Sequence, residues 1–229
     1  NKVFKFKSLN MPEIIEVSLD NLTTPLPKGT WANYSLGVIA QFVKGGNVPE
    51  TGADILIWGN VPGGAGLSSS AALEVVTGVA INDVYGFGLD RLTLVKYGQK
   101  SEHEFAGVMC GIMDQFASGM GKADNAVFLN CDTLEYELVP VVLKGVKIVI
   151  GNTNSPHSLD SGKYNERVAE CQAAVEAIKP HIAINNLGEL TQAQFDSVAD
   201  KITNETVMRR ARHVVGEIDR TTRAVSELK

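Results

Sequence analysis

Cysteine is scarce in this sequence of 229 residues, which contains only Cys110, Cys131 and Cys171. Three widely spaced cysteines are too few for a disulfide framework, and such usage is typical of a reducing, cytoplasmic compartment. The sequence also lacks any apolar run near the ~20 residues that cross a bilayer, and no signal-peptide pattern opens it. We therefore expect a cytoplasmic protein with no membrane partner.

Positive charge is in the minority, since 21 Lys and Arg residues stand against 26 Asp and Glu residues, a formal net charge of -5. This balance argues against nucleic acid as a partner, because nucleic-acid binding requires a basic surface. Hydrophobic residues make up 44% and charged residues 21% of the sequence, which is close to the globular average. A disordered or fibrous protein is therefore excluded.

The order of apolar and polar residues predicts a mixture of strands and helices. We expect strands at 3–9, 14–19, 53–58, 126–129, 134–141 and 146–150, and helices at 31–43, 71–84, 92–105, 162–178, 185–198 and 205–228. The strand at 53–58 and the almost wholly apolar helix at 71–84 are expected to be buried, and Thr30 is a candidate helix cap. Strands and helices do not strictly alternate, which indicates an α+β fold.

The strongest chemical signal is the segment 62–71, Pro-Gly-Gly-Ala-Gly-Leu-Ser-Ser-Ser-Ala, between a predicted strand and a predicted helix. Glycines allow backbone N–H groups to surround an anion, and a helix N-terminus adds a partial positive charge. The segment is neither a P-loop nor the dinucleotide-binding fingerprint, because it has no lysine and no third correctly spaced glycine. A simple turn with a serine cap is the alternative, but three serines exceed what one cap requires.

A second candidate is Asp114, which lies among the apolar residues Ile112, Met113 and Phe116. A charge in such a segment is costly to bury without a partner, so the carboxylate is either a structural ion-pair member or a poised base. Glu102, on the preceding predicted helix, is either an ordinary solvated residue or a metal ligand.

The remaining candidates are a polar segment at 152–159 and the two tryptophans. His157 has no second histidine at metal-ligand spacing, which argues against zinc, and no Gly-x-Ser-x-Gly elbow indicates a serine hydrolase. Trp31 and Trp58 are expected to lie in the core, with stacking on a ligand as the alternative.

Taken together, three segments resemble the GHMP small-molecule kinase family: 61–71 its phosphate-binding motif, 102–118 the segment of its catalytic aspartate, and 152–165 a further motif. Segments 31–34 and 132–136 fit as well. The resemblance implies an α+β fold of two lobes with the active site between them. It also implies an N-terminal domain over 1–145 and the start of a C-terminal domain over 146–229.

The resemblance assigns the nucleotide side of the site first. The residues implied to wrap the phosphates of ATP are Gly63, Gly64, Ala65, Gly66, Leu67, Ser68, Ser69 and Ser70. Ser70 and Glu102 are implied to hold Mg²⁺, and Trp31 to border the adenine. On the sugar side, Gly111, Asp114 and Tyr164 are implied to contact galactose, with Asp114 at the C1 hydroxyl as base or electrostatic anchor.

The implied reaction is transfer of the γ-phosphoryl group of ATP to the C1 hydroxyl of galactose, which gives galactose 1-phosphate. Two alternatives stay open: the same reaction on N-acetylgalactosamine, or a non-catalytic sensor that binds galactose and ATP. We expect a monomer or a weak homo-oligomer.

Two family motifs have no match in this sequence. One is an N-terminal signature with Arg, Glu, His and Asp, which supplies an arginine partner for the catalytic aspartate. The other is a glycine-rich third motif. The sequence also begins with Asn1 in a strand-like segment and ends within a predicted helix. We therefore expect a central fragment that is inactive or severely impaired when isolated.

Overall fold

The computed structural model describes residues 1–152 and 163–229; the predicted site residues between them, His157 among them, lie outside the described residues. The strands are β1 (Val3–Ser8), β2 (Ile14–Ser18), β3 (Asp54–Ile57), β4 (Asn125–Leu129) and β5 (Tyr136–Pro140). The helices are α1 (Asn33–Lys44), α2 (Ser69–Val84), α3 (Arg91–Ser101), α4 (Met113–Met120), α5 (Lys163–Ile178), α6 (Gln192–Val198) and α7 (Glu205–Leu228). Short 3-10 turns lie at Leu19–Asn21, Leu187–Glu189 and Ala199–Lys201, and a π-helical turn at Glu102–Ala106.

The first three strands form one sheet in the order β2-β1-β3, with β1 antiparallel to β2 and parallel to β3. Phe4 pairs with Val17 and Phe6 with Ile55, so the alternation along β1 sends both phenylalanines to the same, buried face. The prediction that β3 is buried is wrong, since its residues alternate between half-buried and exposed. In the described part of the chain β3 is an edge strand, and only one of its faces packs.

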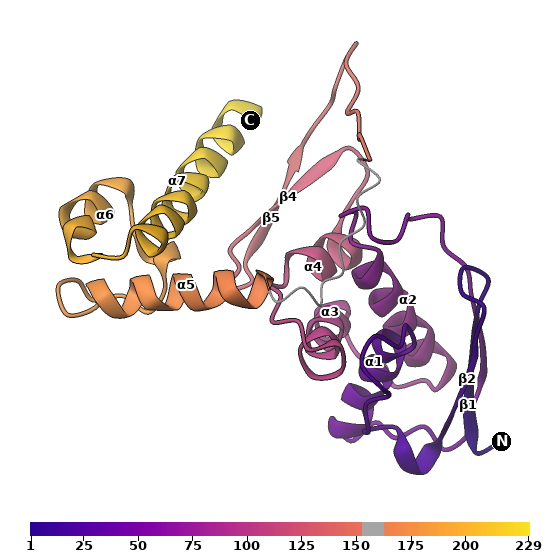
Figure 1. The fold of residues 1–229 in the computed structure, drawn as a ribbon. Helices are drawn as coiled ribbons and strands as arrows, with labels where there is room; N and C mark the ends of the chain where they lie inside the picture. The colour runs from indigo at the N-terminus through magenta and orange to yellow at the C-terminus, as the bar shows by residue number, and fades with distance from the viewer. Residues whose placement is uncertain (153–162) are drawn as a thin grey trace.

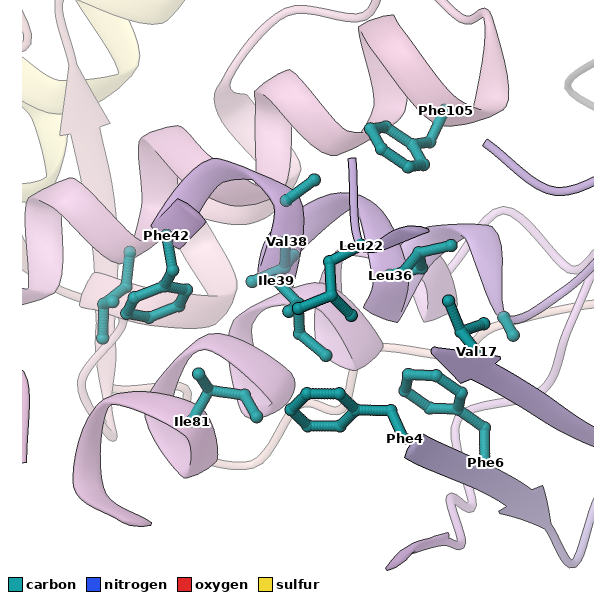
Figure 2. Packing of buried hydrophobic residues seen from close by; sticks show 13 residues of the cluster. Phe4, Phe6, Val17, Leu22, Leu36, Val38, Ile39, Phe42, Ile81 and Phe105 are labelled. Carbon is teal, nitrogen blue, oxygen red and sulfur yellow. The ribbon is translucent and has the colours of Figure 1, made fainter. Parts of the chain in front are cut away.

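Helices α1 and α2 lie beside the buried face of this sheet, and α3 packs against both of them (Figure 1). Figure 2 shows the resulting core, in which Phe4, Phe6 and Val17 from the sheet meet Leu36, Val38, Ile39 and Phe42 from α1. The expected Thr30 cap is wrong: Ala32 is the N-cap of α1, and its side chain makes no capping bond. Asn33 instead bonds the backbone N–H and C=O of Leu26, which fixes the loop before the helix.

Helix α2 is only partly buried, which corrects the expectation that it is central. Ala71, Val75 and Ile81 face the core, whereas Val76 and Val84 are exposed. The helix is apolar on nearly all sides, so its sequence gives no indication of which face packs. The described neighbours α1, α3 and α4 cover one side of it.

The predicted strand at 146–150 is wrong, because this segment is exposed and unpaired within the described part of the chain. A strand needs a neighbouring strand to satisfy its backbone groups, and the two described sheets hold only β1–β3 and β4–β5. The predicted helix at 185–198 is shorter than expected, since a capping box between Thr191 and Gln194 starts α6 at Gln192.

Helices α5, α6 and α7 enclose a separate hydrophobic cluster, made of residues between Ala174 and Val215, and lie apart from α1–α3 (Figure 1). The boundary between residues 145 and 146 stays a prediction. No helix in the described ranges is both long enough and apolar enough to span a bilayer.

Candidate functional site

A cleft of about 830 Å³ lies where the end of β1, the start of α1, the loop before α2 and the start of α4 meet. Of the residues predicted from the sequence, its walls contain Gly63, Gly64, Gly66, Leu67, Ser68, Ser69, Ser70, Trp31 and Asp114. Ala65 is not among the residues that line it. The structure thus brings the glycine- and serine-rich loop and the candidate base, more than forty positions apart in the printed sequence, onto one cavity.

The loop at 63–70 has alternating backbone conformations. Gly64, Gly66 and Ser68 all have positive φ angles, of 68°, 72° and 60°. Residues that alternate between right- and left-handed conformations turn successive N–H groups toward one concavity, which is an anion-binding arrangement. Glycine adopts this conformation readily, whereas Ser68 does so only at a cost in strain, a feature that clusters at ligand-binding sites.

The structure does not support the alternative in which the serines only cap a helix. Ser68 is the N-cap residue of α2, but its side chain makes no capping hydrogen bond. The N–H groups in the first turn of α2 therefore receive no capping hydrogen bond from the Ser68 side chain. This turn lies at the wall of the cleft. An anion bound there would satisfy them and meet the positive end of the helix dipole.

Ser70 lies beside Glu102, where its hydroxyl opposes the effect of burial on the pKa of that carboxyl. Glu102 is buried in the π-helical turn that follows α3, and burial raises the pKa of its carboxyl. Its Oε2 atom has no hydrogen-bond partner among the described residues. A hydroxyl beside a carboxylate with an unpartnered buried oxygen fits a hard cation such as Mg²⁺, which takes oxygen ligands. In the described ranges no group of three or more His, Cys, Asp or Glu side chains is placed to hold a metal ion.

Asp114 is exposed in the first turn of α4, which corrects the expectation that it is buried among apolar neighbours. The amphipathic helix turns Gln115 and Phe116 inward and Asp114 outward, toward the cleft. An exposed carboxylate needs no ion-pair partner to offset burial, so the structural alternative loses its basis. The carboxylate instead faces the cleft, and a carboxylate within hydrogen-bond reach of a hydroxyl is able to accept its proton.

Behind the cleft lies a buried polar pair that the sequence reasoning missed. Gln115 Nε2 donates a hydrogen bond of 2.9 Å to Glu74 Oε2, and both side chains are almost completely buried. Burial, followed by the charge of Glu102, raises the pKa of Glu74 well above its ordinary value. The available signal was a carboxylate, Glu74, directly between the apolar residues Leu73 and Val75 of a predicted buried helix.

Gly111 and Tyr164, both predicted to contact the sugar, are hydrogen-bonded to each other. The Gly111 N–H donates to the Tyr164 hydroxyl at 3.0 Å, across 53 residues of sequence. Neither Gly111 nor Tyr164 is among the residues that line the cleft. Val108 and Asp114, which flank Gly111 in the sequence, do line it.

Both tryptophans line the cleft. Trp31 is half-buried, and its Nε1 is buried with no hydrogen-bond partner in the described part of the chain. Trp58 is 67% exposed, so the expectation that it lies in the core is wrong. Trp58 follows β3, which is the edge strand of the described sheet, and its side chain lines the cleft and does not lie in a hydrophobic core.

Residues 33–122 match the family described as GHMP kinases N terminal domain. The chain is 47% identical over 230 residues to the galactokinase of Clostridium acetobutylicum, a match that covers 100% of this chain and 59% of that protein. It is 46% identical over 229 residues to the galactokinase of Exiguobacterium sibiricum, covering 99% of this chain and 58% of that protein. The chain therefore spans well under two thirds of the length of these relatives.

Solved structures agree with this match. The crystal structure of Lactococcus lactis galactokinase complexed with galactose superposes with a TM-score of 0.95 at 42% identity, covering 100% of this chain and 59% of that one. A crystal structure of mevalonate kinase matches with a TM-score of 0.50 at 18% identity over 95% of this chain, a likeness of fold alone. The predicted α+β fold is confirmed, as is the resemblance to the GHMP small-molecule kinase family.

Proposed function

We propose, from the premise that this chain carries a GHMP kinase N-terminal domain over residues 33–122, that the whole protein transfers the γ-phosphoryl group of ATP to the C1 hydroxyl of galactose. One observation carries the proposal: Asp114 and the loop at 63–70 share the walls of one cleft of about 830 Å³. A phosphoryl donor bound on one wall and a hydroxyl acceptor on the other would lie within reach of each other. The similarity to a galactokinase complexed with galactose supports the choice of sugar.

The loop at 63–70 binds the phosphates of ATP. Its left-handed residues and the first turn of α2 present backbone N–H groups, and the helix dipole adds partial positive charge. None of the described residues that line the cleft is a lysine or an arginine. In this part of the chain, the negative charge of a triphosphate is therefore met by backbone groups and by a bound cation.

Ser70 and Glu102 hold that cation, which we propose to be Mg²⁺. When bound, Mg²⁺ neutralises charge that develops on the phosphate oxygens. The residues of this chain provide a hydroxyl and a carboxylate that lie side by side. The buried position of Glu102 strengthens its interaction with a cation because little water screens it.

Asp114 acts on the acceptor. Its exposed carboxylate accepts the proton of the C1 hydroxyl as the oxygen attacks the γ-phosphorus, or holds that hydroxyl in line for attack. Gly111 and Tyr164 complete the sugar side, and Trp31 borders the adenine. Because phosphoryl transfer depends chiefly on positioning and charge neutralisation, these roles suffice for this part of the site.

The same reasoning extends to partners and compartment. The net charge of -5 supports small molecules and not nucleic acid as ligands. All three cysteines lie in the described ranges and none forms a disulfide, which supports a cytoplasmic location. A monomer or weak homo-oligomer stays our prediction for the assembly.

The test is galactose-dependent release of ADP from ATP and Mg²⁺, measured for the whole protein and for this 229-residue chain. We expect turnover by the whole protein and little or none by the chain alone. Preference for N-acetylgalactosamine in a competition assay would change the assigned sugar. Binding of ATP and galactose by the whole protein without turnover would replace the enzyme with a sensor.

A further inference from the structure

The first turn of α5 is bonded to the loop between the π-helical turn and α4 by two adjacent side chains. Asn165 Oδ1 accepts a hydrogen bond of 3.0 Å from the Met109 N–H, and Asn165 Nδ2 donates one of 3.3 Å to the carbonyl oxygen of Gly107. The Tyr164 hydroxyl accepts a third bond from the Gly111 N–H. These bonds join segments 53 to 58 residues apart, so they fix tertiary and not local geometry.

We propose that Asn165 is a positioning residue for sugar binding, an inference that rests on the proposed function. It holds the loop at 107–111 against α5, and thereby sets the place of the Tyr164 hydroxyl relative to Gly111 and of the segment that leads into Asp114. Asn165 itself does not contact the reacting atoms in this proposal. It acts through the loop and through its neighbour Tyr164.

The chemistry of the side chain supports this role. A carboxamide carries a donor and an acceptor on one rigid group, so it bonds the N–H of one residue and the C=O of another as a neighbouring strand does. Both partners of Asn165 are backbone groups two positions apart in the loop. An aspartate retains only the acceptor, and an alanine retains neither.

The rest of the loop is held from the opposite side. The carbonyl oxygen of Cys110 lies 2.8 Å from His103 Nε2 and accepts a bond of 3.2 Å from Gln99 Nε2. The Val108 N–H donates to the carbonyl oxygen of Glu102 at 3.0 Å. Asn165 and Tyr164 therefore bond those backbone groups of the loop that have no hydrogen bond to α3 or to the π-helical turn.

The position of the loop affects the sugar side of the cleft and not the nucleotide side. Gly111 is followed by Ile112, the N-cap of α4, and Asp114 lies in the first turn of that helix. The loop that binds phosphate precedes α2, on a different wall. Removal of the Asn165 amide is therefore expected to weaken galactose binding and to leave ATP binding unchanged.

The test compares Asn165→Ala and Asn165→Asp with the unmodified whole protein. Galactose and ATP affinities are measured by calorimetry, and amide hydrogen exchange is followed at Met109 and Gly111. For Asn165→Ala we expect galactose affinity to fall about fivefold to tenfold, the low end of what two exposed hydrogen bonds contribute, with ATP affinity within about twofold. Exchange at Met109 should accelerate, while Val108, whose N–H donates to the carbonyl oxygen of Glu102 and not to α5, serves as internal control.

Asn165→Asp retains the acceptor for Met109, so its loss of galactose affinity is expected to be smaller than that of the alanine variant. Asn185→Ala, an exposed asparagine beyond the C-terminal end of α5, is the matched control and should change neither affinity. Unchanged exchange at Met109, unchanged galactose affinity, or an equal loss of ATP affinity would each overturn the proposal. Galactose binding without turnover by the unmodified protein would overturn only the proposed function, because the affinity comparison still decides the role of Asn165. No galactose binding at all would overturn both.

Discussion

The amide of Gln115 donates a hydrogen bond of 2.9 Å to the carboxyl of Glu74, and both side chains are buried between α2 and α4. The pair joins the helix that follows the loop at 63–70 to the helix whose first turn carries Asp114. Gly98 leaves room for it, since a Cβ at that position would lie 3.0 Å from Gln115 Cγ and 3.3 Å from Glu74 Cβ. The remaining oxygen of each side chain has no described partner, which makes the pair sensitive to the protonation of Glu74.

The stability of the protein should depend on pH through Glu74. Its pKa is raised in the folded state by burial, by the charge of Glu102 and by that of Asp114, and lowered by Gln115. The folded state therefore keeps a proton that the unfolded state releases above about pH 4.5, so the free energy of unfolding falls as pH rises from there through the folded pKa. Glu74→Gln cannot ionise and should lose less stability between pH 5 and pH 8.

Urea unfolding at these two pH values checks this prediction. Glu176→Gln, an exposed carboxylate on α5 that accepts a bond from Gln172, is the matched control and should follow the unmodified protein. Parallel losses of stability in Glu74→Gln and in the unmodified protein would contradict the prediction.

Ser70→Ala should weaken ATP binding in the presence of Mg²⁺. The substitution removes a hydroxyl that lines the cleft beside Glu102. Interactions of a hydroxyl with charged groups contribute enough for a loss of about tenfold or more. Calorimetric titration measures the loss. Ser226→Ala, which removes a hydroxyl bonded to a carbonyl oxygen of α7, should leave ATP affinity unchanged. If both variants bind ATP equally well, the serines serve only to start a helix.

Asp114→Asn should lower turnover of the whole protein by roughly 10²- to 10⁴-fold, the range typical of general acid–base groups. Because the side chain is exposed, the melting temperature should stay within the range of an ordinary surface substitution. The measurement is galactose-dependent ADP release, with the exposed substitution Asp200→Asn as control. Full activity of Asp114→Asn would remove the residue from the proposed mechanism.

Intrinsic fluorescence should report nucleotide binding, because the only two tryptophans of the chain, Trp31 and Trp58, both line the cleft. Stacking of adenine against Trp31 is expected to quench its emission. Trp58→Phe should retain the ATP-dependent quench and Trp31→Phe should lose most of it. The opposite pattern would assign the base to Trp58.

The residue pattern alone predicts much of this fold. The alternation of apolar residues at 3–9 marks β1, and the helical periodicities at 162–178 and 205–228 match α5 and α7 closely. These features are local: side chains alternate along a strand and recur every three to four positions along a helix, whatever lies beside them. The position of the loop at 63–70 is likewise predicted by residue type, because glycines permit unusual backbone angles and serines commonly precede helices.

Contacts between distant segments decided the rest. Whether Trp58 enters a core, whether 146–150 forms a strand, and which face of α2 is covered all depend on what packs beside these segments. The outward turn of Asp114 follows from the burial of Gln115 and Phe116, and Gln115 has its partner in Glu74, 41 residues away. The bonds from Asn165 to Gly107 and Met109 also join residues more than fifty positions apart.

The sequence by itself therefore determined most of the elements and the family that its motifs resemble, and it predicted one loop as an anion-binding site. Only the tertiary structure decided which side chains share the cleft, which carboxylate is buried and which is exposed. The physical reason is that hydrogen bonding within elements is set by neighbours along the chain. Burial, electrostatic environment and the partners of polar side chains are set by neighbours in space.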